Sequence, residues 1–349
     1  MKKWLIIVLL PLYCCNFKEG ESPLNLFNNI EELSITDSVL CEELLINPSA
    51  MLVSEEILFF NQYSIKGDSI LAFYDTSTGD FRYILGIGRG PNEILGISDL
   101  WITEDTLCVV SRNELFGYKI SINSLRTGRI CLSKMELSSS IVNYMINTVG
   151  FNQFIAGNSI LASDSEYQFY LYEDTVHVAS FGEYPADIPG NSRDKSFALQ
   201  GPMAFNGSGR TMVHATLFGE RLLFYDFSDK KITLNRGYEW SKPLYTPRST
   251  DVDFYVEFEK DTPIGVPWIS TDGELFYIPY VGKKIGDRDF SCNRVMVFSE
   301  KGEPLKLMCL DRSILMAAIT KTKTAKKLYF LCRDAETLEQ KIYISEIYE

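Results

Sequence analysis

Leu222-Leu223-Phe224-Tyr225 is a short apolar run that ends on aromatic residues and then turns into a second apolar run. The same pattern returns at 71–74, 115–118, 169–172 and 295–298, with a last, partial copy at 342–345. Short strands that repeat at intervals of roughly fifty residues are typical of small β-sheets arranged around an axis, a β-propeller. No long helical periodicity appears anywhere, which argues against α/β folds. The sequence therefore predicts an all-β fold.

The number of repeats predicts the number of propeller blades. From residue 48 onward each unit offers strands separated by turns rich in Gly, Asp and Ser. The roughly 300 residues available make six blades of about fifty residues or seven of about forty-three. Only the interval between Tyr225 and Phe298 is long enough to conceal an additional blade. We expect six blades, with seven as the alternative.

The last unit stops one strand short, which bears on how the two ends of the chain meet. A circular array of sheets must join its ends, so a strand from the N-terminal region is expected to complete the last blade. The segment 30–40, with Leu33, Ile35 and Val39 on one alternating face, is the candidate. The predicted propeller domain is therefore 30–349.

The N-terminus carries a targeting segment. Lys2 and Lys3 precede an apolar run at 4–13 that is too short to span a bilayer permanently. The tetrapeptide Leu12-Tyr13-Cys14-Cys15 resembles the lipobox of bacterial lipoproteins. That resemblance implies a signal peptide at 1–14, lipid attachment at Cys15 and a flexible tether at 15–29. Lipidation at Cys14, or a plain secreted protein with two unmodified cysteines, remains the alternative.

Composition and charge limit the classes of partner. A chain of 349 residues with 46% hydrophobic and 13% aromatic residues can bury a large core. The formal net charge of −12 becomes −14 when the signal peptide is removed with Lys2 and Lys3. Such an excess of acid repels phosphate backbones, which excludes nucleic acid as a partner. Contact with a membrane is expected through the lipid anchor.

Single cysteines lie within apolar strand-like runs beyond the targeting segment, at positions 41, 108, 131, 292, 309 and 332. No CxxC pair occurs, which argues against a zinc site. We expect mostly buried thiols, with one disulfide left open as an alternative.

Three features are candidates for a binding or catalytic site. The glycine-rich segment 86–94 lacks the final glycine and the following helix of a nucleotide loop, so it indicates a tight crossing between blades. Arg89 within it becomes an anion-binding candidate if it points into the central channel. Asp251, Asp253 and Glu257 are candidate calcium ligands, although their alternation also fits the exposed face of a strand. Ser192 begins an S-x-x-K match, but the segment lacks the partner motifs of an acyl enzyme and is expected to be a loop.

The two histidines and a basic cluster have simpler explanations. His177 and His214 lie in alternating strands without metal-ligand spacing, so packed or surface roles are expected. Lysines at 321, 323, 326 and 327 are expected to protect a strand edge or solvate a hairpin, with docking of an acidic partner as the alternative.

Several segments resemble the TolB-like or NHL-like six-bladed β-propellers of Bacteroidota, many of which are lipoproteins. They are Gly86-Ile87-Gly88-Arg89-Gly90-Pro91-Asn92-Glu93-Ile94, Phe181-Gly182-Glu183-Tyr184-Pro185, and the runs 207–215 and 219–226. The resemblance extends over nearly all of the chain after the signal peptide. It implies the propeller fold and a place in the bacterial cell envelope, on either the periplasmic side or the outer surface.

The expected function is a binding or scaffold module that uses loops at one mouth of the channel to bind a protein or glycan partner. No nucleophile motif is present, and no cofactor is expected. The alternative is a metal-assisted lyase or lactonase that holds calcium in the central channel.

Overall fold

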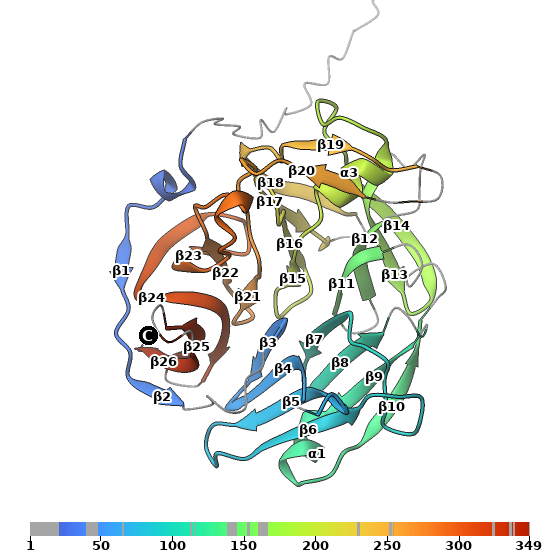
Figure 1. Cartoon of the computed structure of the whole chain (residues 1–349), viewed down its shortest axis with the longest axis vertical. Helices are drawn as coiled ribbons and strands as arrows, with labels where there is room; N and C mark the ends of the chain where they lie inside the picture. Colours follow the sequence, from blue (N-terminus) through green and yellow to red (C-terminus); the bar gives the residue numbers. More distant parts are fainter. Residues whose placement is uncertain are drawn as a thin grey trace, which may run out of the picture.

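The computed structural model describes residues 21–348, with gaps at 40–47, 65, 112–113, 115, 138–144, 152–153, 160–166, 229–230, 251–252, 254, 323–324, 335–336 and 338. Short antiparallel sheets stand around a common centre, as Figure 1 shows. In each four-stranded sheet the strands follow one another in chain order. The chain therefore folds as an all-β β-propeller, as the repeat predicted.

Four sheets have four strands each. The first contains β3 (Ala50–Ser54), β4 (Ile57–Tyr63), β5 (Ser69–Asp75) and β6 (Phe81–Gly86), and the second contains β7 (Asp99–Thr103), β8 (Thr106–Ser111), β9 (Phe116–Ser121) and β10 (Leu132–Glu136). The third contains β11 (Met145–Phe151), β12 (Phe154–Ser159), β13 (Tyr167–Glu173) and β14 (Val176–Glu183), and the fourth contains β15 (Met203–Phe205), β16 (Thr211–Ala215), β17 (Glu220–Asp226) and β18 (Thr233–Ser241).

The C-terminal third forms an eight-stranded sheet. Its strands are β21 (Ser270–Thr271), β22 (Phe276–Tyr280), β23 (Cys292–Phe298), β24 (Pro304–Lys321), β25 (Ala325–Arg333), β26 (Gln340–Tyr348) and two N-terminal strands, β1 (Ile30–Glu32) and β2 (Asp37–Val39). The long strand β24 belongs to two parts of this sheet. Met308 lies opposite Val295 of β23, whereas Ala318 lies opposite Tyr329 of β25.

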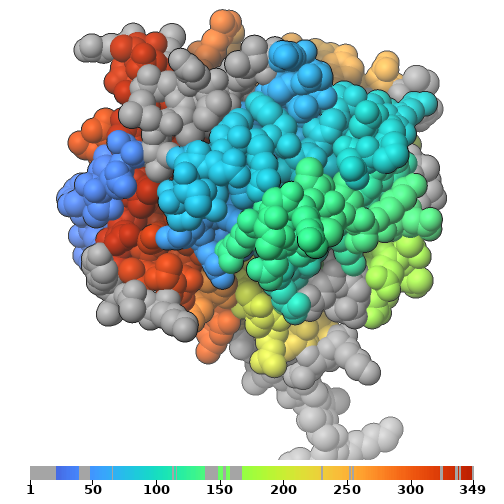
Figure 2. Space-filling model, turned by 90° about the horizontal axis from the view of Figure 1, so that it is seen from below, coloured from blue at the N-terminus to red at the C-terminus, as the bar shows by residue number. Residues whose placement is uncertain are grey.

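The N-terminal segment runs along the edge of this sheet. A short 3-10 helix, η1 (Pro23–Leu26), precedes β1, which pairs in parallel with β24, and β2 pairs antiparallel with β26. Figure 2 shows these blue strands lying against the red C-terminal strands. The ring of Phe27 packs edge-on against Phe298, with 5.4 Å between centroids. The segment 15–29 was expected to be a flexible tether. Its second part is instead attached to the propeller, because Pro23 and Phe27 are buried against the sheets.

The remaining elements are short. They are the helices α1 (Ile122–Arg126), α3 (Ser192–Ala198) and η4 (Ile285–Asp287), and a separate hairpin of β19 (Tyr245–Pro247) and β20 (Val256–Phe258). The segment at Ser192 was expected to be a loop, and that expectation was wrong. No helix in the described residues has the length and apolar character needed to cross a membrane.

The core lies between neighbouring sheets, which explains the apolar runs of the sequence. Phe224 on β17 contacts Phe298 of the next sheet, with 5.5 Å between ring centroids. Its neighbour Tyr225 contacts Phe169 of the preceding sheet, also at 5.5 Å. Successive side chains of a strand point to opposite faces. A strand packed on both faces therefore needs a continuous apolar run.

The described cysteines are all free. Cys108, Cys292 and Cys332 are buried, as the apolar runs around them predicted, whereas Cys131 is exposed. Burial raises the pKa of the Cys108 thiol to about 11. Cys41 lies outside the described residues.

Candidate functional site

The connections between strands fall at two ends of the propeller. Because neighbouring strands within a sheet are antiparallel, successive connections lie alternately at one end and the other. The long connections 87–98, 184–202, 242–269 and 281–291 share one end, which we call the loop end. The tight turns after β3, β7, β15 and β21 share the opposite end, which we call the turn end.

Two of the long connections fold together at the loop end. The connection 184–202 contains α3, and the connection 242–269 contains the β19–β20 hairpin (Figure 1). Ile188, Ala198 and Leu199 pack with Tyr245 of the hairpin in one apolar cluster. We call this assembly, residues 184–202 and 242–262, the cap.

A buried carboxylate joins the two parts of the cap. Asp194 closes a capping box at the start of α3, because its Oδ2 accepts the N–H of Asn191 at 3.1 Å. Its Oδ1 accepts the N–H of Ser249 from the other connection at 3.0 Å. Tyr245 donates its hydroxyl to the carbonyl of Pro189 at 2.6 Å, and burial raises the pKa of this phenol. These bonds hold the two connections as one unit.

Three aromatic rings lie side by side at the edge of the cap. Phe258 of β20 and Phe218 have their ring centroids 4.2 Å apart, and Phe218 and Phe290 are 6.5 Å apart. Phe290 is 40% exposed, and Phe218 and Phe258 are partly exposed. We call these three residues the aromatic ridge.

The charges around the aromatic ridge are arranged in pairs. Lys284 binds Asp261 at 2.8 Å, and Lys283 binds Asp289 at 2.6 Å. The hydrogen bond from Lys284 lowers the pKa of Asp261, and the same bond raises the pKa of Lys284. The backbone just before η4 places Lys284 near the ridge, because Lys284 forms a β-bridge with Pro263. Both lysines that precede η4 are therefore paired with an aspartate.

Two of the three candidate calcium ligands, Asp253 and Glu257, are described in the structure and lie within the cap. Glu257 on β20 is exposed and binds Arg248 at 2.9 Å, and Asp253 is exposed as well. Asp251 lies outside the described residues. Across the described parts of the chain, no three His, Cys, Asp or Glu side chains lie close enough together to hold a metal ion. Val256 and Phe258 face inward while Glu257 is exposed, so β20 fits the alternation of an ordinary strand.

Arg89 lies exposed in the glycine-rich connection at the loop end. The glycines around it make room for Glu93. The N–H of Gly90 donates to Oε2 of Glu93 at 2.6 Å, and a Cβ on Gly88 would lie 2.1 Å from the same oxygen. Tyr118 of the next sheet donates to the carbonyl of Glu93 at 3.1 Å. The segment is thus a crossing between sheets, and the role of Arg89 in anion binding stays a prediction.

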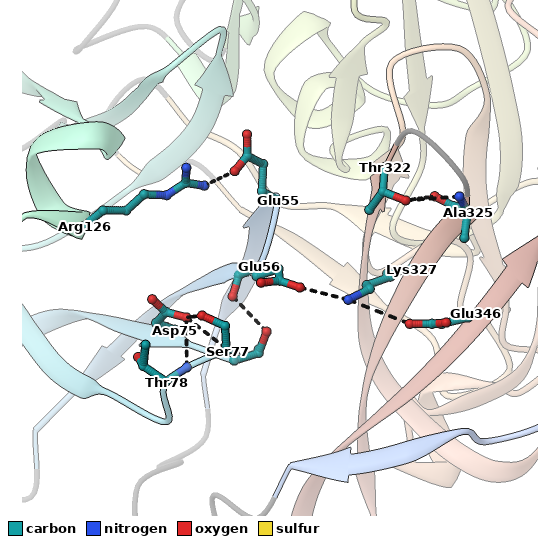
Figure 3. A network of polar contacts seen from close by, with 11 residues as sticks. Glu55, Glu56, Asp75, Ser77, Thr78, Arg126, Thr322, Ala325, Lys327 and Glu346 are labelled. Carbon is teal, nitrogen blue, oxygen red and sulfur yellow. Dashed lines mark hydrogen bonds and ion pairs between the residues drawn. The ribbon is translucent and has the colours of Figure 1, made fainter.

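The turn end is held by ion pairs between neighbouring sheets (Figure 3). Glu55, in the turn after β3, pairs with Arg126 of α1. Glu56 accepts a hydrogen bond from Lys327 at 2.9 Å, and Lys327 also lies 3.7 Å from Glu346. The bond to Glu56 raises the pKa of Lys327. These contacts join the first sheet to its neighbours on both sides.

The other lysines of the basic cluster have acidic partners too. Lys321 binds Glu274 at 2.9 Å, and Lys326 binds Asp272 at 2.8 Å. Burial disfavours the charged form of Asp272, but its bonds from Lys326, two backbone N–H groups and Tyr277 outweigh burial and lower its pKa. Lys323 lies outside the described residues. The three described lysines therefore join strands of the last sheet to neighbouring acids.

The two histidines have the packed and surface positions that the strand pattern predicted. His177 is exposed and lies 3.0 Å from the hydroxyl of Ser180. His214 is fully buried on β16, with its ring 4.8 Å from that of Phe169.

Sequence reasoning missed the aromatic ridge and the carboxylate of Glu93. Phe218, Phe258 and Phe290 come from three separate connections, so no local pattern links them. The sequence did contain a signal for the position of the Glu93 carboxylate. Glu93 follows three alternating glycines, and the missing Cβ atoms of those glycines leave space that the carboxylate fills.

Comparisons with known proteins agree with the fold. No protein-family profile matches the sequence, nor does any curated protein. A candidate exported protein of Bacteroides fragilis matches over 95% of this chain and 99% of its own, with a TM-score of 0.52 and 10% identity. At this identity the likeness concerns the fold alone.

Two further solved structures match at lower similarity. The β-propeller domain of Cps50 (Swd1) from Myceliophthora thermophila has a TM-score of 0.43 at 10% identity and covers 90% of this chain and 99% of its own. A luciferin-regenerating enzyme has a TM-score of 0.44 at 11% identity and covers 85% of this chain and 89% of its own. These scores are too low to support any argument about function.

Proposed function

We propose that this protein is a β-propeller of the bacterial cell envelope, anchored by lipid at Cys15, that serves as a binding or scaffold module for a protein or glycan partner. The lipobox-like tetrapeptide supports the anchor, and the glycine-rich segment supports membership of the TolB-like or NHL-like propellers. The fold itself dictates no reaction.

We further propose six blades. The innermost strands β3, β7, β11, β15, β21 and β24 contact one another in sequence, and β24 contacts β3 again. Strand β24 would serve as the outer strand of the fifth blade and the inner strand of the sixth. The interval that was long enough for a seventh blade contains the two-stranded β19–β20 hairpin. Both observations support six.

The cap is the observation that carries the binding role. A propeller needs only short connections to join one blade to the next, yet two connections here fold into a separate unit with its own apolar cluster. Its bonds through Asp194 join the two connections, and Tyr255 and Leu244 are exposed on it. Exposed aromatic and aliphatic side chains on a rigid support are common features of protein and glycan binding sites.

Photo-crosslinking tests the binding role. A benzoylphenylalanine placed at Tyr255 is expected to crosslink to a defined envelope component in intact cells. The same probe at Tyr63 is the matched control, because both tyrosines are 53% exposed. Equal crosslinking patterns at the two positions would contradict a binding role for the cap.

The anchor and the enzyme alternative have separate tests. A Cys15→Ala variant is expected to lose labelled palmitate and to leave the membrane fraction, and retention of both would refute lipidation at this residue. Binding by the cap requires no cofactor, so calcium is expected to leave the melting temperature unchanged. A calcium-dependent rise that is lost on neutralising channel carboxylates would favour the lyase or lactonase alternative.

A further inference from the structure

The N-terminal segment joins the body of the protein at the loop end. Pro23 lines a small crevice together with Glu220, Trp240, Gly265 and Val266. Glu220 begins β17 and Val266 lies in the connection before β21, and both positions are at the loop end. Cys15 is eight residues before Pro23. A chain of that length spans at most roughly 28 Å.

The aromatic ridge begins next to this point. Phe218 forms a β-bridge with Ile264, which directly precedes Gly265 of the crevice. Gly219, between Phe218 and Glu220, donates its N–H to the carbonyl of Pro263 at 2.9 Å. Since consecutive Cα atoms are about 3.8 Å apart, the ridge starts within about 10 Å of the crevice wall. A lipid at Cys15 would therefore keep the ridge close to the bilayer.

The chemistry of the ridge suits a lipid surface. Phe290 exposes 40% of its surface. Its ring lies against that of Phe218, which in turn contacts the ring of Phe258. Aromatic rings are favoured at the boundary between headgroups and acyl chains. The flanking Lys283 and Lys284 are each paired with an aspartate, so the surface offers little attraction to anionic lipids.

We propose that the aromatic ridge docks on the zwitterionic surface of the membrane that holds Cys15, with Phe290 entering the interface. The proposal rests on the lipid anchor of the proposed function. Docking by one exposed ring is weak in solution, but the anchor supplies a high effective concentration of membrane. In that setting Phe290 is expected to favour the docked state by about tenfold.

Depth-dependent quenching tests the docking. The mature lipid-anchored protein carrying Phe290→Trp is reconstituted into phosphatidylcholine vesicles with brominated acyl chains. The fluorescence of this tryptophan, after subtraction of the signal of the unsubstituted protein, is expected to be at least threefold lower in these vesicles than in non-brominated vesicles. Val176→Trp is the control, since Val176 is 63% exposed and begins β14 at the turn end. The tryptophan introduced by this control substitution is expected to remain unquenched.

The outcomes separate the ridge from the anchor. Protein that floats with vesicles but shows equal, weak quenching at both positions refutes membrane docking by the ridge and leaves the anchor intact. Protein that fails to float refutes the anchor, and the docking proposal falls with it. Raising the salt concentration from 30 mM to 0.5 M shortens the Debye length roughly fourfold. This change is expected to leave quenching at position 290 unchanged. Loss of quenching in salt would show that charge, and not the aromatic ridge, holds the body to the membrane.

Discussion

Acidification is expected to destabilise the protein through His214. This side chain is fully buried on β16, where its ring packs 4.8 Å from that of Phe169. Burial, assisted by the positive charge of Arg221 and opposed by the Leu199 backbone, lowers its pKa from 6.5 to about 3. The folded protein therefore keeps His214 neutral at pH values where the unfolded chain binds a proton.

The size of the effect follows from this difference. Below pH 6.5 the unfolded state binds one proton more than the folded state at this position, so stability falls as the pH falls and the loss ends near pH 3. Each pH unit is worth about 1.4 kcal/mol. Between pH 6.5 and 4.5 the expected loss from His214 is thus about 2 to 3 kcal/mol.

Urea unfolding of His214→Leu at pH 7.5, 5.5 and 4.5 tests this reasoning. The variant is expected to lose about 2 kcal/mol less than the natural chain on acidification, because leucine binds no proton in either state. His177→Gln is the matched control, since His177 is exposed and this variant should follow the natural chain. If His214→Leu loses as much stability as the natural chain between pH 7.5 and 4.5, the reasoning is refuted.

Three further predictions concern packing, charge and thiol reactivity. Gly88→Ala is expected to lower the unfolding free energy by about 2 kcal/mol, because its Cβ meets the Glu93 carboxylate and its φ of +159° disfavours a side chain. In a Glu93→Ala background urea unfolding should recover only the part of that cost that is due to the carboxylate. Lys326→Met is expected to cost about 3 kcal/mol in the same assay, since it leaves a buried carboxylate without its cation; a loss below about 0.5 kcal/mol would contradict this. Titration with a thiol reagent is expected to modify Cys131 rapidly and Cys108 only in urea, and a Cys131→Ser variant that keeps the fast phase would disprove the assignment.

The sequence predicted the sheets well because the propeller buries both faces of each strand. Phe224 and Tyr225 each contact a different neighbouring sheet, and this double burial produces the apolar run that is visible in the sequence. The pairing of the two chain ends was predicted because the last repeat lacks a strand. The structure shows this pairing, since β2 lies beside β26.

The cap was predicted less well because long-range packing determines it. Helix α3 has only seven residues, too few for an apolar period to be detected, although Asn191 followed by Asp194 three residues later is a recognisable start signal. The contact between Asp194 and Ser249 joins positions 55 residues apart. The position of Phe290 beside Phe218 likewise depends on how two sheets pack, so neither could be read from a local pattern.

The pairing of β2 with β26 has a consequence for how the chain acquires its shape. Asp37 lies opposite Ile344, so β2 meets its partner only after almost the whole chain has been made. Closing a loop of that length carries an entropic cost of about 5 kcal/mol, and contacts between such distant residues form slowly. Strand β2 has no partner until β26 has been made, and this edge of β26 is open until β2 pairs with it. During that interval the bare strand edge is open to chaperones or to another copy of the chain.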